Sequence, residues 1–207
     1  MTTAGYELSA EEETSLSRLT AAGLPSLELL LGILQAGLAK KQQDLQDLEG
    51  ALLAVEQAHM GALPSSDPLA AVKSPDSPLG TAMWQPIFAS SGGFPRLLYI
   101  PVLELFDMSN SAARQTVDII TELGPITTHF LGTCSWASEA RFSYSIKQIR
   151  LDHFSWSSTF PMPIKLDNEL TFFFVKGNLA CARSKLGGTM LLMGDPERSK
   201  KYLQAAP

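Results

Sequence analysis

The residues that most often carry chemistry are few and scattered in this sequence. The histidines His59, His129 and His153 lie far apart, without the short spacing by which one element holds a metal ion. No serine stands in a Gly-x-Ser-x-Gly motif, and no Cys-His or carboxylate pair has the spacing of a nucleophile and its base. We therefore expect no metal site and no enzyme. An enzyme acting on an isoprenoid inside a barrel is the weakest interpretation.

The cysteine content and the charge exclude two further classes of function. Cys134 and Cys181 are the only cysteines, and both fall in segments that are typical of strands. One such pair is neither a disulfide framework nor a four-ligand metal site, so we expect packed thiols. The formal net charge of -5 argues against nucleic acid, because binding to its phosphates depends on clustered Lys and Arg.

The aromatic residues are the most informative group. They alternate along predicted strands, so that they could share one inner face of a sheet. Two interpretations stay open: they fill a solid core, or they line a cavity for an isoprenoid, quinone, carotenoid or acyl chain held by burial of apolar area. No other cofactor is expected. The candidate ligand-binding aromatics are Trp84, Phe88, Phe130, Trp136, Phe142, Tyr144, Phe172 and Phe174.

A polar segment from Phe154 to Pro163 also carries large apolar side chains. Phe154, Trp156, Phe160 and Met162 stand among serine, threonine and proline. Such a loop could dip into a membrane surface or a lipid particle, or fold over the mouth of a barrel as a lid.

The second half of the chain has the period of two that is typical of β-strands. Turn signals occur at Lys176-Gly177-Asn178 and Gly187-Gly188, and a change of phase near Lys147-Gln148 predicts a bulge. About eight strands of this length favour a closed antiparallel barrel, with a packed sandwich as the alternative. The predicted strands are Met83–Ala89, Arg96–Val102, Gln115–Thr121, Ile126–Trp136, Arg141–Leu151, His153–Trp156, Leu170–Val175, Leu179–Ser184 and Thr189–Met193.

The first part of the chain is predicted to be helical. Ser9 and Glu12 have the spacing of a capping box at a helix start. The proline-free stretch 26–59 predicts one or two amphipathic helices, with a break possible at Gly37 or Gly50. The predicted organisation is a helical segment 1–62, a Pro/Ser-rich linker 63–79, a barrel 80–194 and a tail 195–207.

Two features bear on sorting and membranes. The most apolar stretch, from Leu24 to Ala39, is shorter than the roughly 20 residues that a membrane-spanning helix needs. The N-terminus has neither a secretory core nor the character of a transit peptide. We expect either an unsorted chain or one from which a targeting segment is missing.

Three groups of residues resemble one known family. The opening segment Gly80–Ser90 has a Gly and a Trp before an aromatic and small-polar run. The closing hairpin spans Leu179–Ser184 and Gly188–Met193, and the centre pairs Phe130–Trp136 with Arg141–Tyr144. Over roughly residues 45–193, this pattern resembles the plastid lipid-associated (fibrillin) family. The chain departs from that family at Lys176-Gly177-Asn178, where we expect an acidic turn, and at Ser184, where we expect Gly, so it resembles a divergent member.

The resemblance implies a fold and a function. The fold is a lipocalin-like barrel behind N-terminal helices, in which Arg183 covers the ring of Trp84 by a cation–π contact of about 0.5–2 kcal/mol and joins the ligand-binding set. The function is non-enzymatic binding of a lipid or isoprenoid at a thylakoid or plastoglobule surface in the chloroplast.

A second interpretation, from another class, is a structural or assembly subunit. The leucines of the first half could form an apolar helix face that docks onto a photosynthetic membrane protein complex. The face in question comprises Leu27, Leu30, Leu31 and Leu34.

Overall fold

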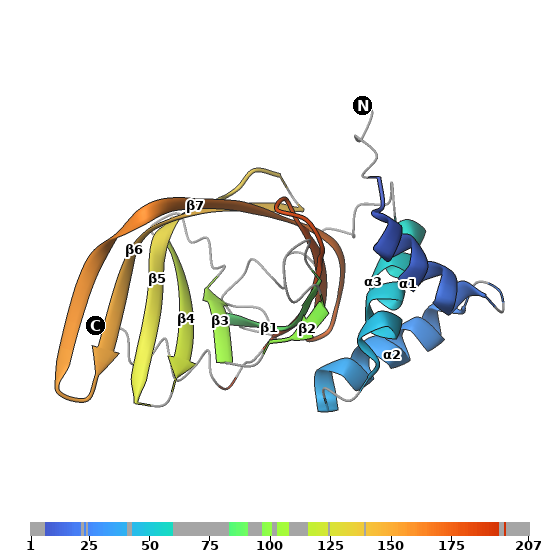
Figure 1. The fold of residues 1–207 in the computed structure, drawn as a ribbon, viewed down its shortest axis with the longest axis horizontal. Coiled ribbons are helices and arrows are strands. Elements are labelled where there is room, and N and C mark those ends of the chain that lie inside the picture. Colours follow the sequence, from blue (N-terminus) through green and yellow to red (C-terminus); the bar gives the residue numbers. More distant parts are fainter. Residues whose placement is uncertain are drawn as a thin grey trace.

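The chain forms a helical layer followed by a sheet that curls into a barrel (Figure 1). This computed structural model describes residues 7–21, 23, 25–40, 43–59, 83–90, 97–100, 103–107, 116–123, 125–138, 140–194 and 197. The expected linker 63–79 and almost all of the tail 195–207 lie outside these residues. Within them, no helix is both long and apolar enough to span a membrane.

Three helices precede the sheet: α1 (Ala10–Thr20), α2 (Leu27–Lys40) and α3 (Leu45–His59). The predicted capping box is confirmed. The Ser9 hydroxyl accepts the Glu12 N–H at 3.2 Å, and a Glu12 carboxylate oxygen accepts the Ser9 N–H at 2.9 Å. These bonds satisfy amides that the first turn of the helix leaves free.

The prediction that Gly37 or Gly50 breaks a helix is wrong, because both lie inside helices. The break falls instead before Asp44, whose carboxylate accepts N–H groups of the first turn of α3. The glycines allow close helix contacts. A Cβ on Gly50 would lie 2.5 Å from the Ser15 carbonyl oxygen of α1, and one on Gly37 would lie 2.9 Å from Leu48 of α3.

Nine strands follow, and the chain is mainly β as the sequence predicts. All neighbouring strands are antiparallel. The strands are β1 (Met83–Ser90), β2 (Leu97–Tyr99), β3 (Leu103–Asp107), β4 (Thr116–Leu123), β5 (Ile126–Trp136), β6 (Arg141–His153), β7 (Trp156–Lys176), β8 (Leu179–Ser184) and β9 (Thr189–Gly194).

The first strand closes the sheet. β1 pairs with β9 along most of its length, while Met83 and Trp84 pair with β3. The order β1-β3-β4-β5-β6-β7-β8-β9 therefore returns to β1, and β2 adds to the far end of β1. The seam between β1 and β3 is short, and β4 to β7 form the tall arch of Figure 1. The expected antiparallel barrel of about eight strands is confirmed.

The expected loop 154–163 is instead part of a strand. β6 and β7 form one long hairpin that turns at Phe154-Ser155, and β7 runs for 21 residues, so it includes the predicted strand Leu170–Val175. The first residue pair between β7 and β8 is Leu170 with Ser184. Within the described residues, 156–168 thus have only β6 as a partner strand, and prolines are tolerated on such an edge because an N–H there needs no partner.

The bulge predicted near Lys147-Gln148 is confirmed. The register between β6 and β7 shifts between Ile146 and Gln148, and the β5–β6 register shifts at the same place. Gly132 lies opposite this bulge, and a Cβ there would lie 2.0 Å from the Ser145 carbonyl oxygen. Only a residue without a side chain lets the two backbones approach so closely.

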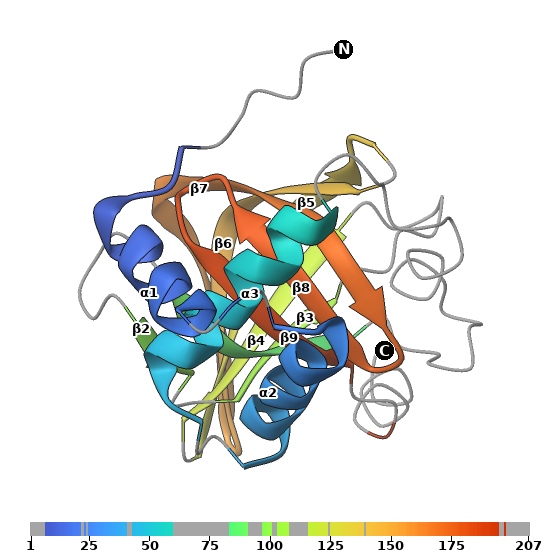
Figure 2. The same cartoon turned by 90° about the vertical axis from the view of Figure 1, so that its right-hand side faces the viewer.

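Two apolar cores lie on opposite faces of the sheet. One fills the barrel and contains Trp84 and Phe172. The other joins α2 and α3 to the outer face of β1, β8 and β9, where Leu34, Leu52 and Leu191 are fully buried. Figure 2 shows the three helices lying across these strands. The helices therefore close one side of the barrel from outside.

The Gly132 contact yields a test of the barrel geometry. Replacing Gly132 with Ala should lower the free energy of unfolding by about 3 kcal/mol, the upper end of ordinary overpacking, because the obstacle is backbone. Urea unfolding would measure it. The matched control is Gly32→Ala on α2, where a Cβ meets nothing within 4 Å, and which should stabilise by up to about 1 kcal/mol. Equal effects at both glycines would contradict the close approach.

Candidate ligand-binding interior and the adjoining hairpin

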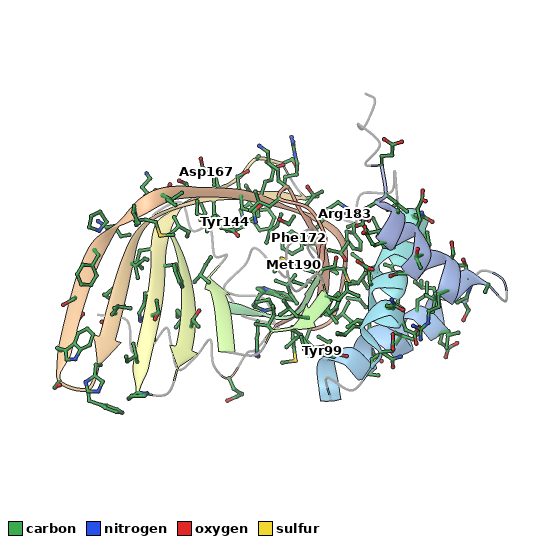
Figure 3. All side chains as sticks on the ribbon, in the orientation of Figure 1. Tyr99, Tyr144, Asp167, Phe172, Arg183 and Met190 are labelled. Carbon is green, nitrogen blue, oxygen red and sulfur yellow. The ribbon has the colours of Figure 1, made fainter. Side chains whose placement is uncertain are left out.

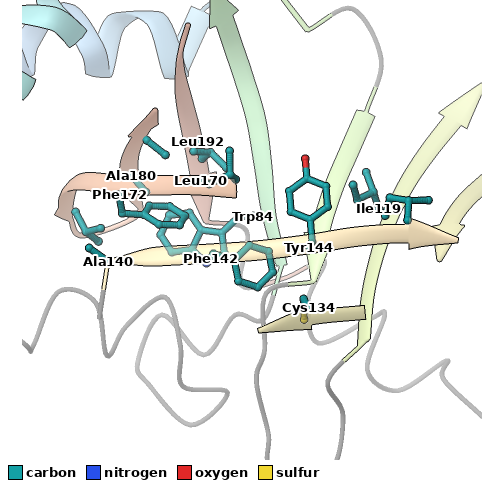
Figure 4. Packing of buried hydrophobic residues seen from close by; sticks show 13 residues of the cluster. Trp84, Ile119, Cys134, Ala140, Phe142, Tyr144, Leu170, Phe172, Ala180 and Leu192 are labelled. Atoms are coloured by element: carbon teal, nitrogen blue, oxygen red, sulfur yellow. The ribbon is translucent and has the colours of Figure 1, made fainter. Parts of the chain in front are cut away.

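The barrel interior brings together six of the eight aromatic residues that the sequence nominates. They gather with smaller side chains from β8 and β9, such as Ala182 and Leu192 (Figure 4). The aromatic members are Trp84, Phe130, Trp136, Phe142, Tyr144 and Phe172.

The interior is densely packed at the Trp84 end. The ring centroids of Trp136 and Phe142 are 5.1 Å apart, and those of Trp136 and Phe172 are 5.7 Å apart. Trp84, Phe142 and Phe172 are almost completely buried. Of the two interpretations of the aromatic set, a filled core describes this end.

Some polar groups lie within the interior. The Asn168 amide donates to the Tyr144 hydroxyl at 3.0 Å and accepts the Ser184 hydroxyl at 3.1 Å, which joins β6, β7 and β8. The Trp84 indole N–H is buried and has no hydrogen-bond partner in the described part of the chain. Such a group costs about 1–3 kcal/mol of folding free energy unless an acceptor reaches it.

At its opposite end, the apolar interior continues onto the β6–β7 hairpin. The cross-strand pairs Ile119 with Phe130, Phe130 with Ile149, and Ile149 with Phe160 form one row across β4 to β7. Ile119 and Phe130 belong to the interior, whereas Phe160 is 51% exposed. Because paired residues share a face of the sheet, the apolar interior continues outward onto the hairpin.

Large apolar side chains are exposed along this hairpin. Phe154 at the turn is 91% exposed, and Ile164 is 75% exposed. Trp156 stacks on His153, with ring centroids 5.8 Å apart, and remains 44% exposed. Met162 differs from the other residues nominated here, because it packs against the interior. Three of the four expected rim residues are therefore exposed, and Ile164 and Leu166 join them.

The outer face of the hairpin is polar and supports its shape. Asp152 on β6 accepts the Ser157 hydroxyl at 2.6 Å and the Arg150 guanidinium at 3.1 Å, and His129 of β5 lies 3.2 Å away. These contacts, the Ser157 hydrogen bond first, hold the pKa of Asp152 below its usual range against a weaker effect of burial.

Phe88, Phe174 and Arg183 are not in the interior, and this corrects the predicted site. Phe88 and Phe174 belong to the core under the helices. Register shifts between Pro86 and Phe88, and between Phe172 and Phe174, reverse the alternation of the strand. A bulge moves every later residue to the other face, which simple alternation along the sequence does not predict.

Arg183 turns to the helices and away from Trp84, so the expected cation–π contact is wrong. On β8, Ala182 lies in the interior and Cys181 under the helices, so that Arg183 shares the helix-facing side (Figure 3). Its guanidinium donates to both Glu56 carboxylate oxygens, one at 2.6 Å, and to Glu12 at 3.1 Å. Burial alone would lower the pKa of Arg183, but the two carboxylates raise it above the usual value.

The sequence analysis missed Glu12 and Glu56 as partners of this arginine. The capping box predicted a local role for Glu12, and the structure adds a second one, since its other oxygen binds Arg183. A glutamate on a helix gives no sequence signal of a partner more than a hundred residues away.

The leucine face that was expected to dock onto a partner protein is largely buried within this chain. Leu30 and Leu34 are buried under the barrel, and Leu31 packs partly against the same core. Leu27 and the neighbouring Leu29 stay exposed.

The groups that could do chemistry stay apart. Among the described residues, no three His, Cys, Asp or Glu side chains come together to hold a metal ion. Cys134 and Cys181 are buried free thiols, as expected, and burial raises the pKa of Cys181 well above its usual value. Such a thiol is a poor nucleophile.

The Arg183 cluster yields a stability prediction. Arg183→Met should lower the free energy of unfolding by about 3–5 kcal/mol, because it leaves buried carboxylates without their cation. The double variant Arg183→Met/Glu56→Leu should regain part of this loss, since it removes one of the stranded charges. Urea unfolding of the two variants measures both effects. Equal stability of Arg183→Met and wild type would contradict a coupled cluster.

The Asp152 contacts yield a pH prediction. A carboxyl whose pKa is lowered on folding adds stability above its unfolded pKa of about 3.9, and this stability is lost as the pH falls through the folded value. Asp152→Asn should therefore be less stable than wild type near neutral pH, with the difference vanishing in acid. Glu28→Gln, at an exposed position of α2, is the control and should show no such dependence. A stability difference between Asp152→Asn and wild type that grows as the pH falls would contradict a lowered pKa of Asp152.

Comparisons with protein family models, with curated proteins and with solved structures give no match. The resemblance to plastid lipid-associated proteins therefore remains a prediction that depends on the residues quoted for it. The described residues form an antiparallel barrel behind three helices.

Proposed function

We propose that this chain is a non-enzymatic protein that binds an apolar molecule, a lipid or an isoprenoid, at a lipid surface. The β6–β7 hairpin is the part that enters the surface. The apolar molecule lies along the row of apolar side chains that runs from Ile119 to Phe160.

One observation supports this proposal above the others. Large apolar side chains are exposed on one projecting hairpin, where its inner face continues the interior of the barrel. Exposed apolar patches of this kind mark interaction sites, because contact between apolar surface and water is otherwise unfavourable. They are Phe154, Trp156, Phe160, Ile164 and Leu166.

The charge of the hairpin favours a lipid surface with anionic headgroups. Residues 147–166 contain Lys147, Arg150 and Lys165 against the single acid Asp152, in a chain whose net charge is -5. A basic segment with aromatic residues at its tip is typical of proteins that lie in the membrane interface. The family resemblance would make that surface a thylakoid or a plastoglobule.

Binding to vesicles tests the proposal. Phe154→Ser/Phe160→Ser should lower partition onto anionic phospholipid vesicles at least about tenfold, because it removes apolar area that is buried in the interface. The control is Leu27→Ser/Leu29→Ser, which removes comparably exposed leucines from α2 and should bind within about twofold of wild type.

Two outcomes would overturn the proposal. The first is that the wild-type protein does not bind vesicles. The second is that the hairpin variant and the α2 variant lose vesicle binding equally. Organic extraction and native mass spectrometry of the protein from its own membranes would identify the apolar molecule. A stable protein partner with no lipid would favour the assembly-subunit interpretation.

A further inference from the structure

A polar groove with a volume of about 420 Å³ lies on the outer face of β5, β6 and β7. This size falls within the range of small-molecule sites. The hydroxyls, carboxylates and ammonium that line it belong to Thr133, Ser135, Ser143, Ser145, Asp167, Glu169 and Lys185, with Cys134, Tyr144 and Asn168 between them.

The strand register explains the shape of this groove. Thr133, Ser145 and Asp167 form one row of paired residues across the three strands. Ser135, Ser143 and Glu169 form a second row, two residues further along. The side chains of the row between them, Cys134 with Tyr144, belong to the interior, so that the floor of the groove is backbone.

The groove has unused capacity for hydrogen bonds. The Ser145 hydroxyl is buried and has no partner within the described ranges. The Ser143 hydroxyl donates to Glu169 at 2.9 Å, and the Arg141 guanidinium lies 3.9 Å from the other oxygen of that carboxylate. Thr133 and Ser135 are exposed to solvent.

The charges of the lining limit the class of ligand. Asp167 and Glu169 are balanced by Lys185 and by Arg141, whose guanidinium lies 3.9 Å from Glu169, so the groove has no excess positive charge to attract a phosphate or sulfate. A hydroxyl-rich neutral group suits the lining, because its O–H groups donate to carboxylates and its oxygens accept from serine and threonine. We propose that this groove binds a neutral polyhydroxyl group, such as the sugar of a glycolipid or a free sugar.

The position of the groove connects it to the lipid surface, and in this respect the inference rests on the proposed function. Asp167 directly follows Leu166, which is partly exposed on the other face of β7. Up to residue 168, β7 pairs with β6 alone in the part of the chain that the structure describes, so its edge separates the polar groove from the apolar hairpin face. A glycolipid could cross this edge, with its tail on the apolar side and its sugar in the groove.

The experiment combines two probes on the full chain. The first is vesicle binding, with phosphatidylcholine alone and with added glucosyl diacylglycerol. The second is an NMR titration with methyl β-glucoside, with inorganic phosphate as the anionic comparison. The groove variant is Ser145→Ala/Asp167→Ala, and the control is Thr159→Ala, an exposed position on β7 outside the groove.

The glycolipid should strengthen vesicle binding by about fivefold in wild type and in the control, and not in the groove variant. The reason is that a protein already bound to the vesicle gains a second, weak contact with the sugar of the glycolipid. Binding of the groove variant to plain vesicles should be unchanged, since its hairpin is intact. If the free glucoside shifts the Ser145 and Glu169 amide signals but the glycolipid does not strengthen vesicle binding, the groove is assigned to a free sugar.

Absence of both the glycolipid effect and the glucoside shifts would overturn the inference, as would phosphate binding at the same amides. Loss of binding to all vesicles, with glucoside shifts retained, would overturn the proposed function and leave the groove assignment standing. The two failures are therefore distinguishable.

Discussion

A guanidinium buried between a layer of helices and a barrel requires carboxylates at its nitrogens, and Arg183 finds them on α1 and α3. Glu12 is held for this contact by the capping box that starts α1, so a local helix signal also fixes a long-range ion pair. The cluster joins α1 and α3 to β8 by directional, charge-assisted hydrogen bonds, which apolar packing alone does not provide. Leu34, Leu52 and Leu191 supply the apolar contact around it.

The helix layer decides which part of the barrel is available to a ligand. It covers the outer face of β1, β8 and β9 and the end of β7, and with them Phe88 and Phe174. Trp84, Phe142 and Phe172 fill the adjacent part of the interior. Of the eight large apolar side chains that are exposed among the described residues, five lie on the hairpin formed by β6 and β7. The proposed function follows from this asymmetry between the side covered by helices and the exposed hairpin.

Much of the fold was predictable from sequence because its signals are local. The capping box at Ser9, the bulge near Gln148 and the glycine turns at Gly177 and Gly187 each depend on a few adjacent residues. The membership of the site was less predictable. Alternation assigns six aromatics to the interior but fails for Phe88 and Phe174, since each follows a bulge that reverses the strand face. The partners of Arg183 and the length of β7 depend on contacts between distant segments, which one sequence does not reveal.

The most direct test of the central claim uses the tryptophans of the chain as reporters of depth. Trp156 lies on the exposed hairpin, whereas Trp84 and Trp136 belong to the interior. With anionic vesicles made from brominated lipids, quenching of tryptophan emission reports which indole enters the acyl region. The account predicts strong quenching that disappears in Trp156→Phe, with vesicle binding retained. Bound protein whose emission is not quenched, or is quenched equally without Trp156, would contradict the insertion of the hairpin.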